Sequence, residues 1–305
     1  MEHTTLFNIL ISILLIKFVL DTVLNHLNAK HFNDTPPNEV SDVYEIDEYR
    51  KSQQYKKTNH NFNIFSSLFS LLTILSFFFF NGFLMLDNFA RGFSDNTITT
   101  TLIFFGIISI GSDIISIPFS LYKTFVIEGG FGFNKTSKKT FFLDKLKGLL
   151  MTIFLGGAIL ALITWFYEFT GSYFWLYTWG LITLFSLFMN MFYSRLIVPL
   201  FNKQTALEAG TLRNEISAYA ETVGFTLNKI FVIDGSKRST KANAYFSGFG
   251  SEKRVTLYDT LINDLEEDET HFDGHTMITN LSCPKCEAYV EVYHGKRNEE
   301  KRACN

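Results

Sequence analysis

The chain has 305 residues, a formal net charge of −3, and 47% apolar residues that include 34 phenylalanines. A slightly negative chain without a basic stripe argues against a nucleic-acid partner. Apolar runs of this number and length exceed what a soluble domain can bury, whereas a bilayer can hold them. We therefore expect an integral, multi-pass membrane protein in contact with the lipid bilayer.

Five apolar segments are each close to the ~20 residues that cross a ~30 Å hydrocarbon core. The first contains Lys17 and Asp21, whose i,i+4 spacing lets the two side chains pair and reach one interface. This segment has no basic n-region and no small-residue cleavage site, so we expect a retained anchor rather than a signal peptide. The predicted spans are Thr5–Leu24, Ile64–Leu86, Ile98–Leu121, Leu149–Tyr167 and Tyr173–Val198.

The charges of the connecting loops predict the topology. Asn25–Asn63 carries four lysines and Arg50, and Tyr122–Gly148 carries six lysines, whereas the two intervening loops hold only Arg91 as a basic residue between them. Basic loops favour the cytoplasmic side. We expect the N-terminus outside and everything after Pro199 in the cytoplasm, in either an endoplasmic reticulum or a bacterial inner membrane.

Shorter elements are predicted around the spans. Tyr44–Lys57 has the composition of a polar helix that leads into the second span, and Leu207–Val223 has helical apolar spacing. Three β-rich runs separated by Gly, Ser and Lys turns predict a small three-stranded sheet. These runs are Lys229–Ile233, Asn243–Phe249 and Arg254–Tyr258.

Four groups of residues occur in a distinctive order along the chain. Glu128–Lys135 reads EGGFGFNK and is followed by Phe141–Asp144; Arg195–Lys203 reads RLIVPLFNK. Gly235–Ser239 reads GSKRS, and Asn243–Phe246 reads NAYF. In this order, with apolar segments between them, they resemble the type I CAAX prenyl endopeptidases, which are membrane zinc metalloproteases.

The resemblance implies a fold class and a domain organisation. It implies an all-α polytopic membrane bundle, part of a chambered helical barrel, followed by a small α+β segment of an incomplete gluzincin-like protease domain. Residues 1–203 would form the membrane domain and residues 204–269 the start of the metallopeptidase domain. We expect residues 270–305 to be a divergent, disordered tail.

The resemblance also implies a chemistry. The family hydrolyses a peptide bond near a prenylated cysteine, with zinc held by a His-Glu-x-x-His helix. An extended peptide substrate would lie along an edge strand and bond to its backbone. The candidate substrate-binding residues are Asn243, Ala244, Tyr245 and Phe246, and an ordinary half-buried strand is an equal alternative for them.

The metal-binding motif of the family is absent from the 305 residues. His271 and His275 have i,i+4 spacing, but Phe272 stands where the general base would be, and Gly274 weakens the helix that would hold both imidazoles. We therefore assign no catalytic residue and no metal ligand, and we expect zinc in the family but not in this chain.

Alternatives remain open for the metal and for the function. His271 and His275 could join Cys283 and Cys286 in a zinc knuckle, because these ligand types suit tetrahedral zinc. As for function, we expect a protease of this type that is inactive as written. A non-catalytic membrane peptide-binding protein and a truncated or frameshifted protease are the other interpretations.

Overall fold

The computed structural model describes residues 3–32, 35, 46–225, 227, 229–249 and 252–264. Residues 1–131 and 156–164 form one compact unit, and residues 132–155 and 165–305 form a second. The predicted tail, with the candidate zinc knuckle of His271, His275, Cys283 and Cys286, lies outside the described residues.

The first unit is built from long helices. Helix α1 (His3–Ala29) lies against α2 (Ile46–Phe79). Phe7 contacts Phe78 and Phe79, with ring centroids 6.0 and 5.7 Å apart. The other elements of this unit are α3 (Gly82–Arg91), α4 (Thr97–Leu121), the π-helix η2 (Tyr122–Glu128) and residues 157–164 of α6 (Gly157–Thr170).

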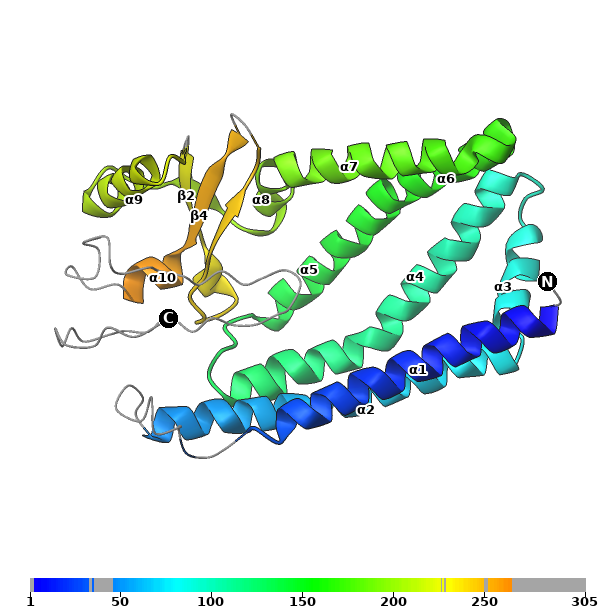
Figure 1. Ribbon diagram of the computed structural model, residues 1–305, viewed down its shortest axis with the longest axis horizontal. Coiled ribbons are helices and arrows are strands. Elements are labelled where there is room, and N and C mark those ends of the chain that lie inside the picture. Colours follow the sequence, from blue (N-terminus) through cyan, green and yellow to red (C-terminus); the bar gives the residue numbers. More distant parts are fainter. Residues whose placement is uncertain are drawn as a thin grey trace. The chain divides into compact units, whose positions relative to one another are not determined.

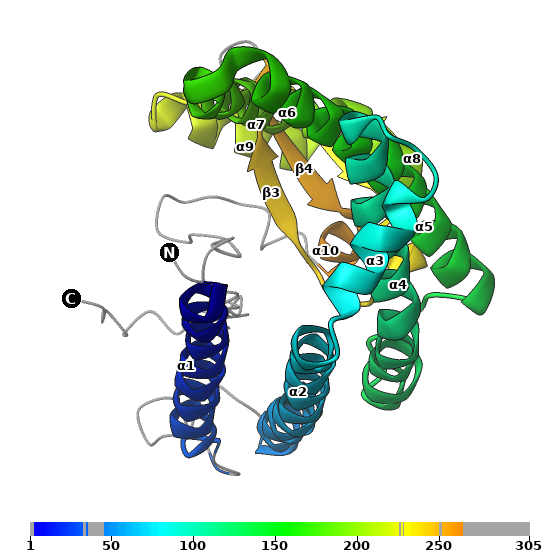
Figure 2. The same cartoon turned by 90° about the vertical axis from the view of Figure 1, so that its right-hand side faces the viewer.

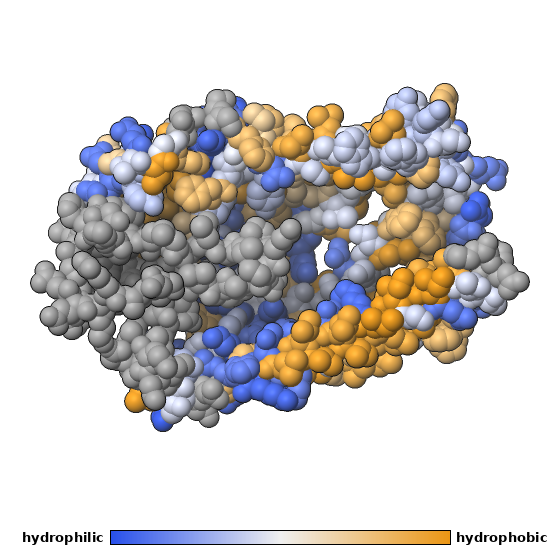
Figure 3. Space-filling view, in the orientation of Figure 1, coloured by the Kyte–Doolittle hydropathy of each residue, from blue (hydrophilic) through white to orange (hydrophobic). Residues whose placement is uncertain are grey.

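Helix α1 has the surface of a membrane-spanning segment. Large aliphatic side chains such as Ile13 and Ile16 are more than half exposed, and Figure 3 shows hydrophobic residues gathered over this helix. The predicted pair of Lys17 and Asp21 is present, with 2.5 Å between Nζ and Oδ2. Because lipid tails can cover the aliphatic side chains, the helix can lie in a bilayer without a protein partner on every side.

The second predicted span, Ile64–Leu86, is wrong at its C-terminal end. Helix α2 begins at Ile46, so the predicted polar helix is continuous with the span, and it ends at Phe79. Asn81 then has φ 55°, a left-handed conformation that asparagine tolerates better than most residues. A Cβ on Gly82 would come within 2.7 Å of the Phe77 ring, so this reversal is tight. Hydropathy continues across the turn and therefore does not reveal it.

A long apolar helical path includes residues of both units, since residues 156–164 belong to the first unit and the rest of the path to the second. Lys138–Phe201 is a single candidate membrane segment of 64 residues. At 1.5 Å per residue it would extend about 96 Å, far more than one bilayer crossing. Gly171, with φ 52°, interrupts it, so the segment accommodates the last two predicted spans. Along this path, shown in Figure 1, lie α5 (Lys138–Met151), η3 (Thr152–Gly156), α6, η4 (Gly171–Tyr173), α7 (Phe174–Leu196) and α8 (Val198–Phe201).

A four-stranded sheet follows the helices. Its strands are β1 (Gln204–Ala206), β2 (Lys229–Ile233), β3 (Ala244–Ser247) and β4 (Arg254–Tyr258), in the order β1-β2-β4-β3. Strands β2 and β4 are parallel, and the two outer strands are antiparallel to their neighbours. The prediction of three strands missed β1, because three residues of sequence Gln-Thr-Ala are too short to show alternation.

The core of this unit lies on the sheet. Ile230, Val255, Leu257 and Leu261 are buried together. Apolar side chains of helix α9 (Thr211–Thr222) pack against them, and Leu261 comes from the short helix α10 (Asp259–Asp264). The predicted helix Leu207–Val223 is confirmed in type, but it begins later, at Thr211, after Gly210.

Candidate functional site

Strand β3 is an outer strand of the sheet. It pairs with β4 in a register that places Ala244 opposite Leu257 and Ser247 opposite Arg254, and Figure 2 shows the two strands side by side. Within the part of the chain that the structure describes, β4 is its sole strand partner. An outer strand offers a row of backbone N–H and C=O groups to another extended chain. The predicted substrate-binding residues therefore lie at an edge of the sheet.

The two faces of β3 have different surroundings. The Tyr245 hydroxyl lies 3.5 Å from Oγ of Ser194, near the end of α7, and the Tyr245 ring lies 6.5 Å from that of Tyr258. Phe246 points to the opposite face, because side chains alternate along a strand. It contacts Phe225 at 5.6 Å and is 58% exposed. A peptide along β3 would therefore place alternate side chains toward α7 and toward Phe246.

Asn243 closes the turn into the strand. Its Oδ1 accepts a hydrogen bond from the N–H of Ala244 at 2.8 Å, and its carbonyl accepts one from the N–H of Tyr258 at 3.0 Å. Burial raises the pKa of the Tyr258 phenol above its ordinary value, and the Tyr245 hydroxyl adds to the rise. The Tyr258 phenol is therefore neutral at physiological pH.

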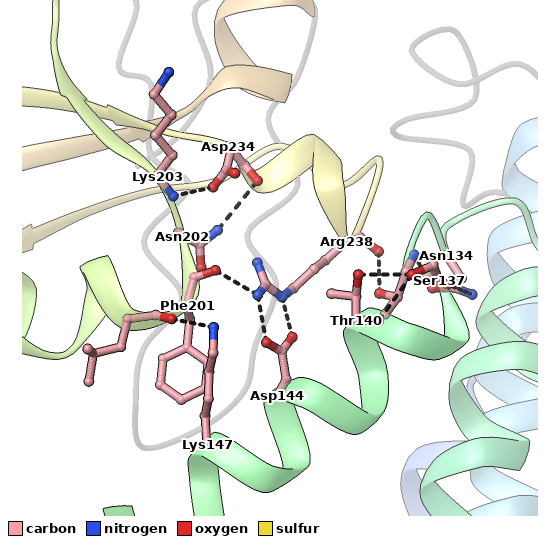
Figure 4. A network of polar contacts seen from close by, with 12 residues as sticks. Asn134, Ser137, Thr140, Asp144, Lys147, Phe201, Asn202, Lys203, Asp234 and Arg238 are labelled. Atoms are coloured by element: carbon pink, nitrogen blue, oxygen red, sulfur yellow. Dashed lines mark hydrogen bonds and ion pairs between the residues drawn. The ribbon is translucent and has the colours of Figure 1, made fainter.

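Arg238 joins three segments that are far apart in the sequence. Its Nε and Nη2 donate to the two carboxylate oxygens of Asp144 on α5, at 2.7 and 2.9 Å. Nη2 also donates to the carbonyl of Phe201 at the end of α8, at 2.8 Å. Figure 4 shows the guanidinium between the carboxylate and this carbonyl. A bidentate pair of this kind is one of the stronger polar contacts in proteins.

The backbone of the same loop pairs with residues before α5. The carbonyl of Arg238 accepts hydrogen bonds from the N–H of Lys135 at 2.9 Å and from Oγ1 of Thr136 at 3.2 Å. Asn134 and Ser239 form an isolated antiparallel bridge. Thus the segment Glu128–Lys135, which sequence analysis singled out, reaches the GSKRS segment through its last residues.

Two aspartates fix the flanks of this loop. Oδ1 of Asp234 accepts a hydrogen bond from the N–H of Lys203 at 2.8 Å (Figure 4), and Oδ1 of Asp259 accepts one from the N–H of Ser236 at 2.8 Å. The Ser236 hydroxyl also donates to Oδ2 of Asp259. The four groups of residues noted in the sequence therefore meet around one loop, the residues between β2 and β3.

Among the described residues, no group of three or more His, Cys, Asp and Glu side chains is arranged to hold a metal ion. These residues do not fit a zinc centre, and no step that uses zinc is derived from them. His271 and His275 lie outside the described residues, so their predicted lack of a catalytic role stays a prediction.

Comparison with known proteins identifies the family. Residues 25–203 match the family described as CAAX prenyl protease N-terminal, five membrane helices, and residues 206–272 match peptidase family M48. The CAAX prenyl protease 1 of Saccharomyces cerevisiae is 33% identical over 277 residues, which are 85% of this chain and 61% of the yeast protein. The homologue of Oryza sativa is 44% identical over 176 residues, which are 58% of this chain and 41% of the rice protein.

A solved structure agrees with these matches. The crystal structure of S. mikatae Ste24p superposes with a TM-score of 0.79 at 34% identity, covering 86% of this chain and 64% of that one. The chain spans about half the length of the curated relatives that it matches. The resemblance seen in the sequence is confirmed, and the chain belongs to the CAAX prenyl protease family.

Proposed function

We propose that this chain provides the membrane helices and the peptide-binding edge of a zinc metalloendopeptidase that acts on prenylated CAAX proteins. The observation that carries the proposal is the open edge of β3, the outer edge that has no strand partner among the residues that the structure describes. It stands next to the end of α7, a candidate membrane segment. An extended peptide can add to such an edge through backbone hydrogen bonds and be distinguished by its alternate side chains.

The hydrolytic step is not assigned to residues of this chain, because its 305 residues contain no His-Glu-x-x-His. A second function, non-catalytic binding of membrane-anchored peptides, is favoured by the same observation. Binding without hydrolysis of the bond next to the prenylated cysteine, in the presence of added zinc, would support the second function over the first.

The binding edge can be tested by photo-crosslinking. The probe is a farnesylated peptide with a CAAX sequence and a benzophenone side chain, mixed with the full chain in lipid nanodiscs. We expect the label on Ala244–Ser247 and on flanking residues of α7. N-methylation of alternate amides in the probe removes backbone donors, so it is expected to abolish the labelling.

The sheet supplies an internal control for this experiment. Its other outer strand, β1, carries the same kind of backbone groups but lies at the opposite side of the sheet. Label on Gln204–Ala206 rather than on β3, or labelling that survives N-methylation, would contradict the proposed edge.

We also propose that the residues after Pro199 lie in the cytoplasm. The basic segment Tyr122–Gly148, which includes η2 and the beginning of α5, supports this orientation. Single cysteines can test it in a background without Cys283, Cys286 and Cys304. We expect Ser172→Cys to react quickly with an impermeant thiol reagent from outside, and Lys139→Cys to react only after permeabilisation. Both positions are exposed, and neither substitution removes the Ser137 cap of α5. The reverse pattern would invert the topology, and equal rates would remove a span.

A further inference from the structure

The segment between β2 and β3 connects two strands that are not neighbours in the sheet. Strand β3 follows β2 in the sequence, but β4 lies between the two strands in the sheet. Residues 234–243 must therefore pass β4 before the chain can enter β3. The position of the open edge depends on what holds this connection in place.

Arg238 is the residue of the connection that bonds to the membrane helices by its side chain. It binds Asp144 with two hydrogen bonds and the Phe201 carbonyl with a third. The side chains of Arg238 and Asp144 are 23% and 24% exposed, so water screens the pair less than it screens an ion pair on the surface. The guanidinium is planar and can satisfy both partners at once, which a lysine ammonium cannot do in the same geometry.

Both partners of Arg238 belong to the long apolar helical path. Asp144 lies on α5, at the beginning of the candidate membrane segment Lys138–Phe201, and Phe201 is its last residue. One side chain thus ties the connection before β3 to the point where the chain enters this segment and to the point where it leaves. The ladder to β4 fixes β3 within the sheet, whereas Arg238 fixes the connection to the helices.

We propose that Arg238, through Asp144, is a positioning residue that holds the open edge of β3 at a fixed place relative to the membrane helices. The inference deepens the proposed function and rests on it. A peptide with a lipid anchor is already confined to the bilayer, so its second contact, with the edge, is effectively intramolecular. That advantage requires that the edge be held where the anchored peptide can reach it.

The inference predicts different effects on the affinity for the farnesylated peptide and on the affinity for the same peptide without farnesyl. In the full chain in nanodiscs, Arg238→Ala is expected to weaken binding of the farnesylated peptide by roughly tenfold or more, because the gain from linked contacts is lost when geometry varies. The same peptide without farnesyl uses the edge alone, and its weaker binding is expected to change by less than about twofold. Loss of the sheet itself would reduce both affinities together.

Three further variants sharpen the comparison. Asp144→Ala is expected to have the same selective effect, and the double variant Arg238→Ala/Asp144→Ala no additional one, since a single contact is lost. Arg238→Lys keeps the charge without the bidentate geometry and is expected to restore only part of the selectivity. The matched control is Arg213→Ala, which removes an exposed arginine of the same unit that bonds to the Leu207 carbonyl, and we expect it to change neither affinity.

A distance measurement tests the positioning without any peptide. Spin labels at Leu146→Cys on α5 and Phe246→Cys on β3 occupy exposed positions of the same unit. We expect a narrow distance distribution that becomes broad in Arg238→Ala. An unchanged distribution, or equal loss of affinity for the two peptides, overturns the inference. Failure of the unmodified chain to bind either peptide would instead overturn the proposed function.

Discussion

Gly248→Ala is expected to destabilise the sheet by about 3 kcal/mol, because the cost of a left-handed backbone conformation for alanine adds to the cost of an overpacked contact. Gly248 has φ 86°, in the turn that leads from β3 toward β4. A Cβ at this position would lie 2.1 Å from the carbonyl oxygen of Glu252, and backbone atoms cannot move aside as a flexible side chain can. Hydrogen exchange of the β4 amides in the full chain measures the effect, and these amides should exchange much faster in the variant.

Gly210→Ala is the matched control for this prediction. Gly210 has φ 173°, an extended conformation that any residue adopts, and a Cβ there meets nothing within 4 Å. We expect exchange in β4 to be nearly unchanged by this substitution. Similar acceleration in both variants would show that the turn at Gly248 is not the source of the effect.

Leu257→Ala is expected to lower the free energy of unfolding of the sheet segment by about 3 kcal/mol, because it removes a buried side chain and leaves a cavity. Leu257 is 6% exposed and lies in the buried cluster with Ile230, Val255 and Leu261. Leu257 also stands opposite Ala244 in the ladder between β4 and β3. Weaker packing of β4 therefore also weakens the pairing of β3 with the sheet. Pulse proteolysis of the full chain in urea should show cleavage of the sheet segment at a lower urea concentration.

Val223→Ala gives the control for core packing. Val223 lies at the end of α9 and is 56% exposed, so its truncation removes little buried surface. We expect the urea dependence of cleavage to match that of the unmodified chain. If Leu257→Ala behaves in the same way as Val223→Ala, the sheet does not depend on the cluster around Leu257.

The sequence predicted the parts of this fold that depend on local patterns. Apolar length predicted the spans, and it failed at Asn81, where a turn occurs inside a continuous apolar run. The β-branched and aromatic runs predicted three strands but not β1, whose three residues carry no alternation. In both places the structure is decided by local geometry that hydropathy does not measure.

The candidate site was only partly predictable. Resemblance indicated Asn243–Phe246 as an edge strand, and the sheet order places β3 at an edge. Asp144 and Arg238 appeared in two separate motifs, and their opposite charges were the available signal. A single sequence does not pair residues that are 94 positions apart. Their contact therefore became visible only in the structure, whereas the predictions for residues 270–305 remain predictions.

The order of strands in the sheet has a consequence for synthesis of the protein. Strand β2 can pair with β1 as soon as it is made, but β3 emerges before β4, the strand with which it forms its ladder. During translation, when N-terminal parts fold first, the backbone of β3 has no ladder partner until Arg254–Tyr258 has also been made. An unpaired strand of this kind is a template for aggregation, so the order of strands makes β3 depend on the prompt addition of β4. The open edge is among the last features of the described chain to form.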